Sequence, residues 1–398
     1  MSNAKSMLER EMKEFIKEFC ITIGPRPPCS SEEAAAANLF KEKLKIHCDD
    51  VVSETFSTHP GAYKAAFRVP MVLYLVSLVF YWLIPWLSLI VSIVLIIILF
   101  GEMTLAKEVI DFMFSKKTSQ NIICKIKPKN QAKTLLIIGC HVDSNWEFPL
   151  IRKLRNKFPI LIGINWFLNT ILFILLIVKN FLLFVGLELI IYPFEIILFL
   201  IFLITIPIPL TQLFFIISNR PVMGANDNLS GMAVCHELVR NLSLPENNPK
   251  NVEIWINAYG CEETGSKGSK AFVKAHFNKI KNAKIINIDM IGNKNSPLLI
   301  GKAEIQGFVK MDEEIINLLK EAGDTLNVKT KITTLIAYTD SLSFCRKKLS
   351  ATSLSSTPQS SKEYYYHTRH DVLENMTFEN LVNAYRICMD VIKRLDRQ

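Results

Sequence analysis

Residues that commonly bind metal ions follow short apolar runs at three places in this chain. The three junctions are Leu135–Ile138 before His141 and Asp143, Val252–Ala258 before Glu262 and Glu263, and Ile285–Ile288 before Asp289. If the runs are strands of an open α/β sheet, their carboxyl ends meet in the crevice where such sheets bind ligands. One imidazole and several carboxylates delivered to that crevice predict a metal site.

Two later residues extend the candidate ligand set. Asp227 lies in the segment GANDNLSG, directly before an expected helix, and His367 lies in YHTRHD near the C-terminus. The candidate metal ligands are His141, Asp227, Glu263, Asp289 and His367. Imidazole and carboxylate ligands suit zinc in hydrolytic sites. A carboxylate can bridge two cations roughly 3.5–4 Å apart, so five ligands with one bridge fit two Zn²⁺ ions.

The adjacent acids Glu262 and Glu263 suggest a division of roles. Glu263 would bind metal, while Glu262 stays free to take a proton from a water whose pKa the metal lowers toward about 7. Asp143 lies two residues after His141, on the same side of the chain if the strand continues. It could therefore hold the imidazole in its orientation for metal binding.

Strand-like and helix-like patterns alternate from Ile122 onward, which predicts an α/β fold. The expected strands are the three runs above with Ile332–Ala337 and Thr352–Leu354, and the expected helices are Met232–Leu242, Lys267–Phe277, Glu313–Ala322 and Asn375–Leu395. At the N-terminus, apolar residues at helical spacing and a capping box from Ser30 to Glu33 predict two more helices. We expect a mixed, mostly parallel sheet covered by helices on both faces.

Five ordered motifs in these segments resemble the di-zinc aminopeptidase family, which also contains glutamate carboxypeptidases and glutaminyl cyclases. They are HVDS at 141–144, GANDNLSG at 224–231, EETGSKGS at 262–269, NIDMIG at 287–292 and YHTRHD at 366–371. The resemblance implies one zinc held by His141 and Asp289, a second held by Glu263 and His367, and Asp227 bridging. It also implies that Glu262 is the general base and Asp143 the partner of His141.

A second histidine, His370, competes with His367 for the last ligand position. In the family pattern the ligand is followed by Thr and, four places on, by Asp, as Thr368 and Asp371 follow His367. We therefore expect His367 to be the ligand.

The resemblance implies hydrolysis of peptide substrates from the N-terminus. Three other functions remain open: a carboxypeptidase, a glutaminyl-cyclase-like acyltransferase with a single zinc, and a non-catalytic membrane scaffold. Scaffolds of this kind usually lose ligands or the base, whereas this chain retains all of them, so a zinc aminopeptidase is the leading hypothesis.

Two apolar stretches interrupt the motifs. Val69–Gly101 holds no charged residue in 33 positions, and Phe158–Ser218 holds only Lys179, Glu188 and Glu195 in 61. One crossing of a bilayer takes about 20 apolar residues, which makes both stretches candidate transmembrane hairpins. The predicted organisation is a catalytic domain in three pieces, 1–68, 102–157 and 219–398, with membrane hairpins at 69–101 and 158–218.

The position of His141 between the two stretches constrains the membrane topology. The other ligands follow the second stretch, and one metal site cannot draw ligands from both sides of a bilayer. Each stretch must then cross an even number of times, and Pro85 between Trp82 and Trp86 offers a turn in the first.

The net charge of +9 comes partly from Lys and Arg that flank the apolar stretches, such as Arg152, Lys153, Arg155 and Lys157. This placement favours contact with membrane lipid over nucleic acid, and the positive-inside rule places the catalytic domain in the cytoplasm. Nine cysteines scattered singly favour a reducing compartment over a disulfide framework. The sequence does not indicate an oligomeric state.

Overall fold

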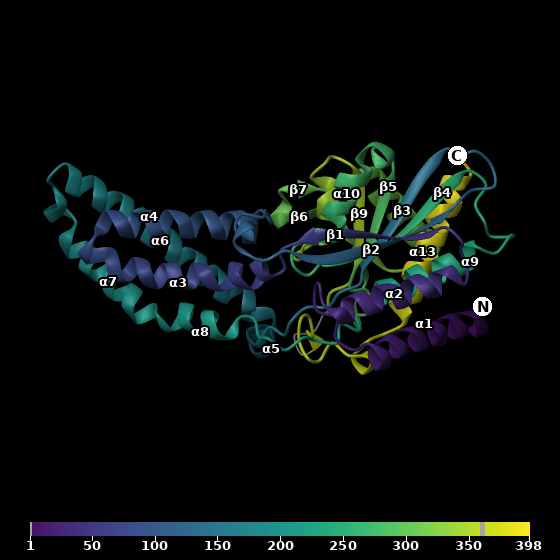
Figure 1. The fold of residues 1–398 in the computed structure, drawn as a ribbon, viewed down its shortest axis with the longest axis horizontal. Coiled ribbons are helices and arrows are strands. Elements are labelled where there is room, and N and C mark those ends of the chain that lie inside the picture. Colours follow the sequence, from purple (N-terminus) through teal and green to yellow (C-terminus); the bar gives the residue numbers. More distant parts are fainter. Residues whose placement is uncertain (1, 359–362) are drawn as a thin grey trace. The chain divides into compact units, whose positions relative to one another are not determined.

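A computed structural model describes residues 2–358 and 363–398 of the chain (Figure 1). The described chain forms two compact units. The sheet unit consists of Met1–Pro60, Lys116–Trp146 and Arg220–Gln398, and the helical unit consists of Gly61–Ser115 and Glu147–Asn219. Each unit is therefore assembled from segments that are separated in the sequence.

The sheet unit is built on one mixed sheet with the strand order β1-β2-β4-β3-β5-β9-β6-β7, and β8 also pairs with β6. Its four central strands, β4, β3, β5 and β9, are parallel, whereas the β1–β2, β2–β4, β9–β6 and β6–β7 pairs are antiparallel. The strands are β1 (Val51–Thr58), β2 (Lys117–Ile126), β3 (Thr134–His141), β4 (Val252–Tyr259), β5 (Lys284–Ile288), β6 (Leu298–Glu304), β7 (Val309–Lys310), β8 (Thr330–Thr334) and β9 (Ser350–Ser355). The carboxyl ends of β4, β3 and β5 lie side by side, as the site requires.

Helices cover both faces of this sheet, which confirms the predicted fold class (Figure 1). Successive strand residues point to opposite faces, so Leu136 and Ile138 pack in the larger core while Ile137 packs in the smaller one. The helices that pack in the larger core are α1 (Ser2–Thr22), α2 (Ser31–Lys45), α9 (Leu229–Leu242), α11 (Glu313–Thr325) and α13 (Glu379–Asp396). The helices that pack in the smaller core are α10 (Lys267–Ile280) and α12 (Ser341–Cys345).

The predicted capping box at α2 forms only in part. The Ser30 hydroxyl accepts a hydrogen bond from the Glu33 backbone N–H at 3.0 Å, as the pattern predicts. The Glu33 carboxylate does not return to Ser30 but accepts from the backbone N–H of Cys29 at 2.8 Å. Glu33 is nearly fully buried, so this carboxylate has a role beyond the end of the helix.

Two predicted elements differ from the structure at their ends. The strand expected at Ile332–Ala337 is β8, which spans Thr330–Thr334; its last bond to β6 runs from Leu335 N to Ala303 O at 2.9 Å. The helix expected from Asn375 begins at Glu379 as α13, and a single 3₁₀ turn precedes it at Leu373–Asn375.

The helical unit contains six α-helices within its described residues. They are α3 (Gly61–Leu83), α4 (Pro85–Ile98), α5 (Pro149–Leu154), α6 (Phe158–Phe184), α7 (Tyr192–Thr205) and α8 (Pro207–Phe215). Pro85 is the first residue of α4 and marks the turn after α3, where its fixed φ and missing N–H are tolerated. Four helical stretches, Gly61–Leu83, Pro85–Glu102, Pro149–Phe184 and Tyr192–Phe215, are long and apolar enough to cross a membrane.

The helical unit exposes apolar side chains and buries polar ones. Leu83 and Ile204 are 71% and 77% exposed. In the interior, the Asn165 side chain donates to Gln212 Oε1 at 3.2 Å, and Glu195 Oε1 accepts from Lys179 Nζ at 2.5 Å and from the Tyr81 hydroxyl at 2.6 Å. A soluble helical bundle has the opposite distribution.

Candidate metal centre

The five predicted ligands come from five separate places in the sheet unit. His141 is the last residue of β3, Glu263 follows β4, and Asp289 directly follows β5. Asp227 precedes α9, whose N-cap Asn228 accepts from Gly231 N at 3.0 Å. His367 lies in the loop before α13 with a left-handed backbone, φ 50°.

Asp227 lies at the centre of the cluster because its two oxygens face different imidazoles. Oδ1 lies 3.1 Å from His141 Nε2, and Oδ2 lies 3.3 Å from His367 Nε2. Asp289 Oδ1 is 3.7 Å from His141 Nε2, and Glu263 Oε2 is 2.9 Å from His367 Nε2. The five side chains therefore divide into two groups that share Asp227.

The donor atoms fit a bound metal. Ligand atoms of His141, Asp227 and Glu263 all lie within 4.8 Å of one another. Glu263 Oε1 and Asp289 Oδ1 are buried oxygens without a hydrogen-bond partner among the described residues. Buried carboxylate oxygens are rarely left in this state, and a cation would satisfy them. Imidazole and carboxylate donors are the set that zinc prefers in hydrolytic sites.

Burial and mutual charge shift the protonation of the cluster. Burial, with the nearby Asp227 charge, raises the pKa of Glu263 to about 7. Burial alone would lower the pKa of His367, but the adjacent Glu263 and Asp227 carboxylates raise it to about 9. Burial also opposes ionisation of Asp227, yet hydrogen bonds from the two imidazoles hold its pKa well below the usual range. Without a metal ion, the carboxylates and imidazoles of the cluster therefore share protons, and a bound cation would displace those protons.

Glu262 lies beside this cluster and outside the pairings described above. Its side chain is nearly buried, and Ser266 donates a hydrogen bond to Glu262 Oε1 at 3.1 Å. Burial raises the pKa of Glu262 well above the ordinary value of a glutamate. A carboxyl group in this environment can take up and release a proton near neutral pH.

Asp143 has more contacts than the sequence predicted. Its Oδ1 lies 3.5 Å from His141 Nδ1, and its backbone carbonyl lies 3.2 Å from the same nitrogen. The two carboxylate oxygens also accept the backbone N–H groups of Glu262 and Glu263 at 2.9 and 3.0 Å. Asp143 therefore fixes a histidine and the turn that carries both glutamates.

Three further side chains, none of them among the predicted site residues, position the cluster. Asn145 Nδ2 donates to Glu263 Oε2 at 2.7 Å. Asp371 accepts the backbone N–H groups of Asn226 and Asp227 at 2.7 and 3.1 Å, which fixes the Asp227 loop. The buried Arg26 donates to the carbonyls of Val142 at 2.8 Å and Gly224 at 3.0 Å, and so holds the loops of two ligands together. Only Asp371 had a sequence signal, its fixed spacing from His367.

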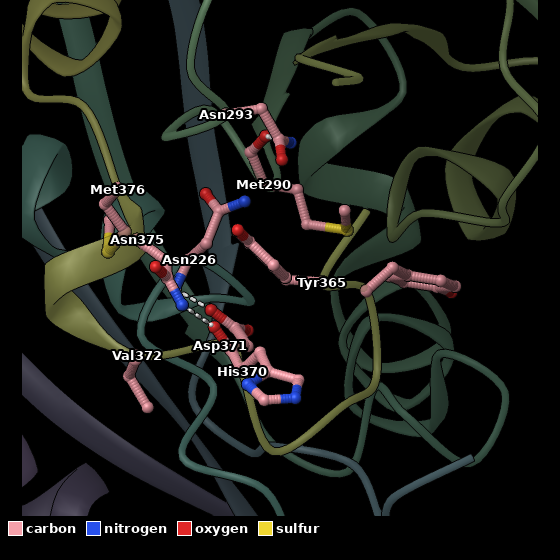
Figure 2. A pocket seen from close by; sticks show the side chains of 10 residues that line it. Asn226, Met290, Asn293, Tyr365, His370, Asp371, Val372, Asn375 and Met376 are labelled. Atoms are coloured by element: carbon pink, nitrogen blue, oxygen red, sulfur yellow. Dashed lines mark hydrogen bonds between the residues drawn. The ribbon is translucent and has the colours of Figure 1, made fainter. Parts of the chain in front are cut away.

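A depression lies beside the cluster (Figure 2). It is lined by the neighbours of three predicted ligands, Asn226, Met290 and Tyr366, together with Asn293, Tyr365, His370, Asp371, Val372, Asn375 and Met376. His370 lines this depression and is exposed, whereas His367 is buried in the cluster. The structure therefore brings His367, and not His370, to the other four candidate ligands.

Residues 211–392 match the model of Peptidase family M28, a segment that contains every predicted ligand except His141. A comparison with curated protein sequences gives no match.

Similar solved structures include three bacterial proteins. An aminopeptidase from Aneurinibacillus sp. strain AM-1 has a TM-score of 0.58 at 15% identity, covering 97% of this chain and 93% of that chain. A Zn-dependent exopeptidase from Parabacteroides distasonis has a TM-score of 0.57 at 14% identity, covering 96% and 97%. A glutaminyl cyclase from Bacteroides thetaiotaomicron, bound to N-acetylhistamine, has a TM-score of 0.56 at 16% identity, covering 96% and 97%.

These matches confirm the resemblance that the five motifs predicted. The protein has the fold of the zinc-dependent exopeptidases, and its residues 211–392 carry the sequence pattern of peptidase family M28.

Proposed function

We propose that this protein is a membrane-embedded zinc aminopeptidase that removes N-terminal residues from peptides. The observation that carries the proposal is the position of Asp227, with one oxygen toward His141 and the other toward His367. A carboxylate placed in this way suits a bridge between two cations. His141 and Asp289 would hold one zinc, Glu263 and His367 the other, and Asp227 both.

Zinc in such a site polarises the substrate carbonyl and lowers the pKa of water. The protein's own contribution is proton transfer and orientation. Glu262 accepts a proton from the attacking water and delivers it to the leaving amine, and its burial supports both directions of transfer near neutral pH. Asp143 acts as a positioning residue because it holds His141 and the backbone of Glu262.

Glu262→Gln provides the test of this mechanism. The variant retains the shape of the side chain and every predicted ligand, but it cannot accept a proton. We expect unchanged zinc content and a loss of turnover on short peptides of about 10²–10⁴-fold, the usual contribution of a general base. Turnover equal to that of the wild type would exclude Glu262 as the base. Peptides blocked at the N-terminus should resist digestion, whereas peptides amidated at the C-terminus should be cleaved; the reverse result would indicate a carboxypeptidase.

A single-zinc acyltransferase is the second candidate. The similarity to a glutaminyl cyclase favours it, since one fold serves both reactions. Zinc stoichiometry of the purified protein distinguishes the two: two ions per chain support the peptidase, whereas one ion and cyclisation of N-terminal glutamine support the acyltransferase.

Membrane embedding is part of the proposal. Four stretches are long and apolar enough to cross, and the helical unit exposes apolar side chains while it buries an ion pair. Both segments of the unit have ends that lie close together. Thr58 and Lys117, which flank the first segment, pair with each other between β1 and β2. At the two ends of the second segment, Ser218 N donates to Glu147 O at 2.9 Å. Segments with adjacent ends return to the side from which they started, which supports an even number of crossings.

The orientation follows from the basic residues. Arg152, Lys153, Arg155 and Lys157 precede α6 and are exposed, and Lys64 and Arg68 lie in the first two turns of α3. The positive-inside rule then places the predicted metal cluster on the cytoplasmic side. Protease protection in sealed vesicles tests this orientation: digestion of the sheet unit from the cytoplasmic side is expected, and digestion only from the opposite side would contradict it.

A further inference from the structure

Two cysteines outside the predicted ligand set lie side by side next to the metal cluster. Cys29 follows the loop Gly24–Pro28, and Cys261 directly precedes Glu262 in the chain. Their sulfur atoms are 3.5 Å apart. The S–S bond of a disulfide is about 2.05 Å long, so closing this pair requires a movement of about 1.5 Å.

One buried carboxylate keeps the two cysteines together. Glu33 accepts the backbone N–H of Cys29 through Oε2 at 2.8 Å and the backbone N–H of Cys261 through Oε1 at 2.5 Å. The Ser119 hydroxyl donates to Oε2 at 3.0 Å and fixes the carboxylate. The backbones of the two cysteines are therefore held close together by one carboxylate, which keeps their thiols within reach of each other.

Both positions have an unusual backbone. Cys29 and Cys261 have φ angles of 57° and 55°, in the left-handed region that favours glycine. Backbone preference therefore does not explain a cysteine at either position. Residues in such conformations are concentrated at functional sites and switch regions.

The two thiols differ in access and reactivity. Cys29 is half-buried, whereas Cys261 is fully buried. The hydrogen bond between the thiols lowers the pKa of Cys29, which favours its thiolate, the reactive form. Cys29 is thus the sulfur that meets an oxidant from solution, and Cys261 is the sulfur placed to attack it next.

We propose that Cys29 and Cys261 form a reversible oxidation site, in which a small peroxide converts the two thiols into a disulfide and thereby displaces Glu262. The sulfur of Cys29 attacks one peroxide oxygen, the O–O bond breaks, and a sulfenic acid and one molecule of water result. The sulfur of Cys261 then attacks the sulfenic sulfur. The S–S bond forms, and the expelled hydroxide takes up the Cys261 proton and leaves as a second water. The two thiols are oxidised by two electrons and the peroxide is reduced.

The consequence for hydrolysis rests on the proposed function of Glu262. Cys261 and Glu262 are consecutive residues in a tight turn, in which the carbonyl of Cys261 accepts from Lys267 N and the carbonyl of Glu262 accepts from Ser266 N. A movement of Cys261 toward Cys29 is therefore passed to the general base. Because a misplacement of about 1 Å can cost about a hundredfold in rate, we expect kcat/KM to fall by about 10- to 100-fold on oxidation and to recover with dithiothreitol.

The experiment uses the full-length protein in detergent micelles, first reduced and then exposed to hydrogen peroxide. After alkylation of the remaining thiols and proteolysis, mass spectrometry should detect one peptide pair joined through Cys29 and Cys261. Cys29→Ser and Cys29→Ala should keep the activity of the reduced protein and should lose both the linked peptide and the sensitivity to peroxide. Cys20→Ser is the matched control, because Cys20 is also half-buried but burial raises its pKa to about 11; this variant should respond like the wild type.

Linked peptide without a fall in kcat/KM would overturn the effect on Glu262. Absence of the linked peptide, with Cys29 oxidised alone or joined to another cysteine, would overturn the site itself. A linked peptide in a protein that hydrolyses no peptide when reduced would support the oxidation site and contradict the proposed function, so the two failures are distinguishable.

Discussion

Asp143→Asn is the substitution that most directly tests how the cluster is held. The aspartate is fully buried, and its carboxylate accepts the backbone N–H groups of Glu262 and Glu263 while Oδ1 lies 3.5 Å from His141 Nδ1. Asparagine has nearly the same shape but only one acceptor oxygen. Whichever way its amide turns, an NH₂ group must face a donor.

The cost follows from these contacts. A hydrogen bond to a charged group contributes about 1.5–3 kcal/mol, and a buried donor left unsatisfied costs about 1–3 kcal/mol more. We therefore expect Asp143→Asn to disturb this region by about 3–5 kcal/mol, divided between stability and the geometry of the site. Outer partners of metal ligands typically change metal affinity or activity by about 10- to 100-fold. Each factor of ten in rate corresponds to 1.36 kcal/mol, so a 10- to 100-fold loss of activity accounts for about 1.4–2.7 kcal/mol of the expected 3–5 kcal/mol.

The assay combines kcat/KM on a short peptide, zinc affinity by competition with a chelator, and thermal unfolding. The matched control is Asp396→Asn, because Asp396 Oδ1 also accepts two consecutive backbone N–H groups, from Lys250 at 2.8 Å and Asn251 at 2.6 Å. Those residues precede β4, at the opposite end of the strand from Glu262. The control should lose stability and retain kcat/KM. A folded Asp143→Asn protein with kcat/KM and zinc affinity within about twofold of the wild type would refute the positioning role.

Three other outcomes are expected. Lys179→Met should lower the free energy of unfolding of the detergent-solubilised protein by about 3–5 kcal/mol, because it leaves Glu195 buried without its cation. The double variant Lys179→Met/Glu195→Gln should recover most of the loss, and equal losses in both variants would contradict this reasoning. Burial raises the pKa of Glu304 to about 8, so the folded state binds its proton more tightly than the unfolded state and the free energy of unfolding should fall between about pH 4.5 and 8. Glu304→Gln should flatten that decline in a series of thermal melts, and an unchanged slope would show that other groups cause it. Removal of metal with a chelator should abolish peptide hydrolysis and lower the melting temperature, and added zinc should restore both. The melting temperature responds because a ligand that binds only the folded state stabilises that state. A melting temperature that does not change with chelator or zinc would argue against a metal bound by the folded protein.

Much of the candidate site could be predicted because its residues sit at the ends of recognisable strands. His141, Glu263 and Asp289 each lie at or directly after an apolar run, and the parallel order β4-β3-β5 places those ends side by side. The positioning residues left no comparable signal. Asn145 and Glu33 each hydrogen-bond a residue more than a hundred positions away, Glu263 and Cys261 respectively, and no local pattern encodes such contacts.

The antiparallel part of the sheet was missed for a different reason. β1 reads VVSETFST and lies at the sheet edge with only its two end residues buried, so it has no apolar run that marks a core strand. In β2, the first half, KTSQN, is polar, and only the second half contributes Ile122, Ile123 and Cys124 to the cores. Edge strands gain their stability from pairing with neighbours that are distant in sequence, which a single sequence does not reveal.

The separation of His141 and Asp227 by 86 positions does not weaken the site, and the reason lies in how the second insertion closes. In the sheet unit, Val222 N donates to Asn145 O at 2.9 Å and Trp146 pairs with Pro221, so the chain re-enters beside the point where it left. The entropy of closing a loop grows only with the logarithm of its length, and here the inserted residues fold on themselves. The ends of the first insertion meet in the same way, where Thr58 pairs with Lys117 across β1 and β2. Because the ends of each insertion are paired within the sheet unit, two long apolar helical insertions are compatible with the zinc-exopeptidase fold and with the close approach of its five candidate ligands.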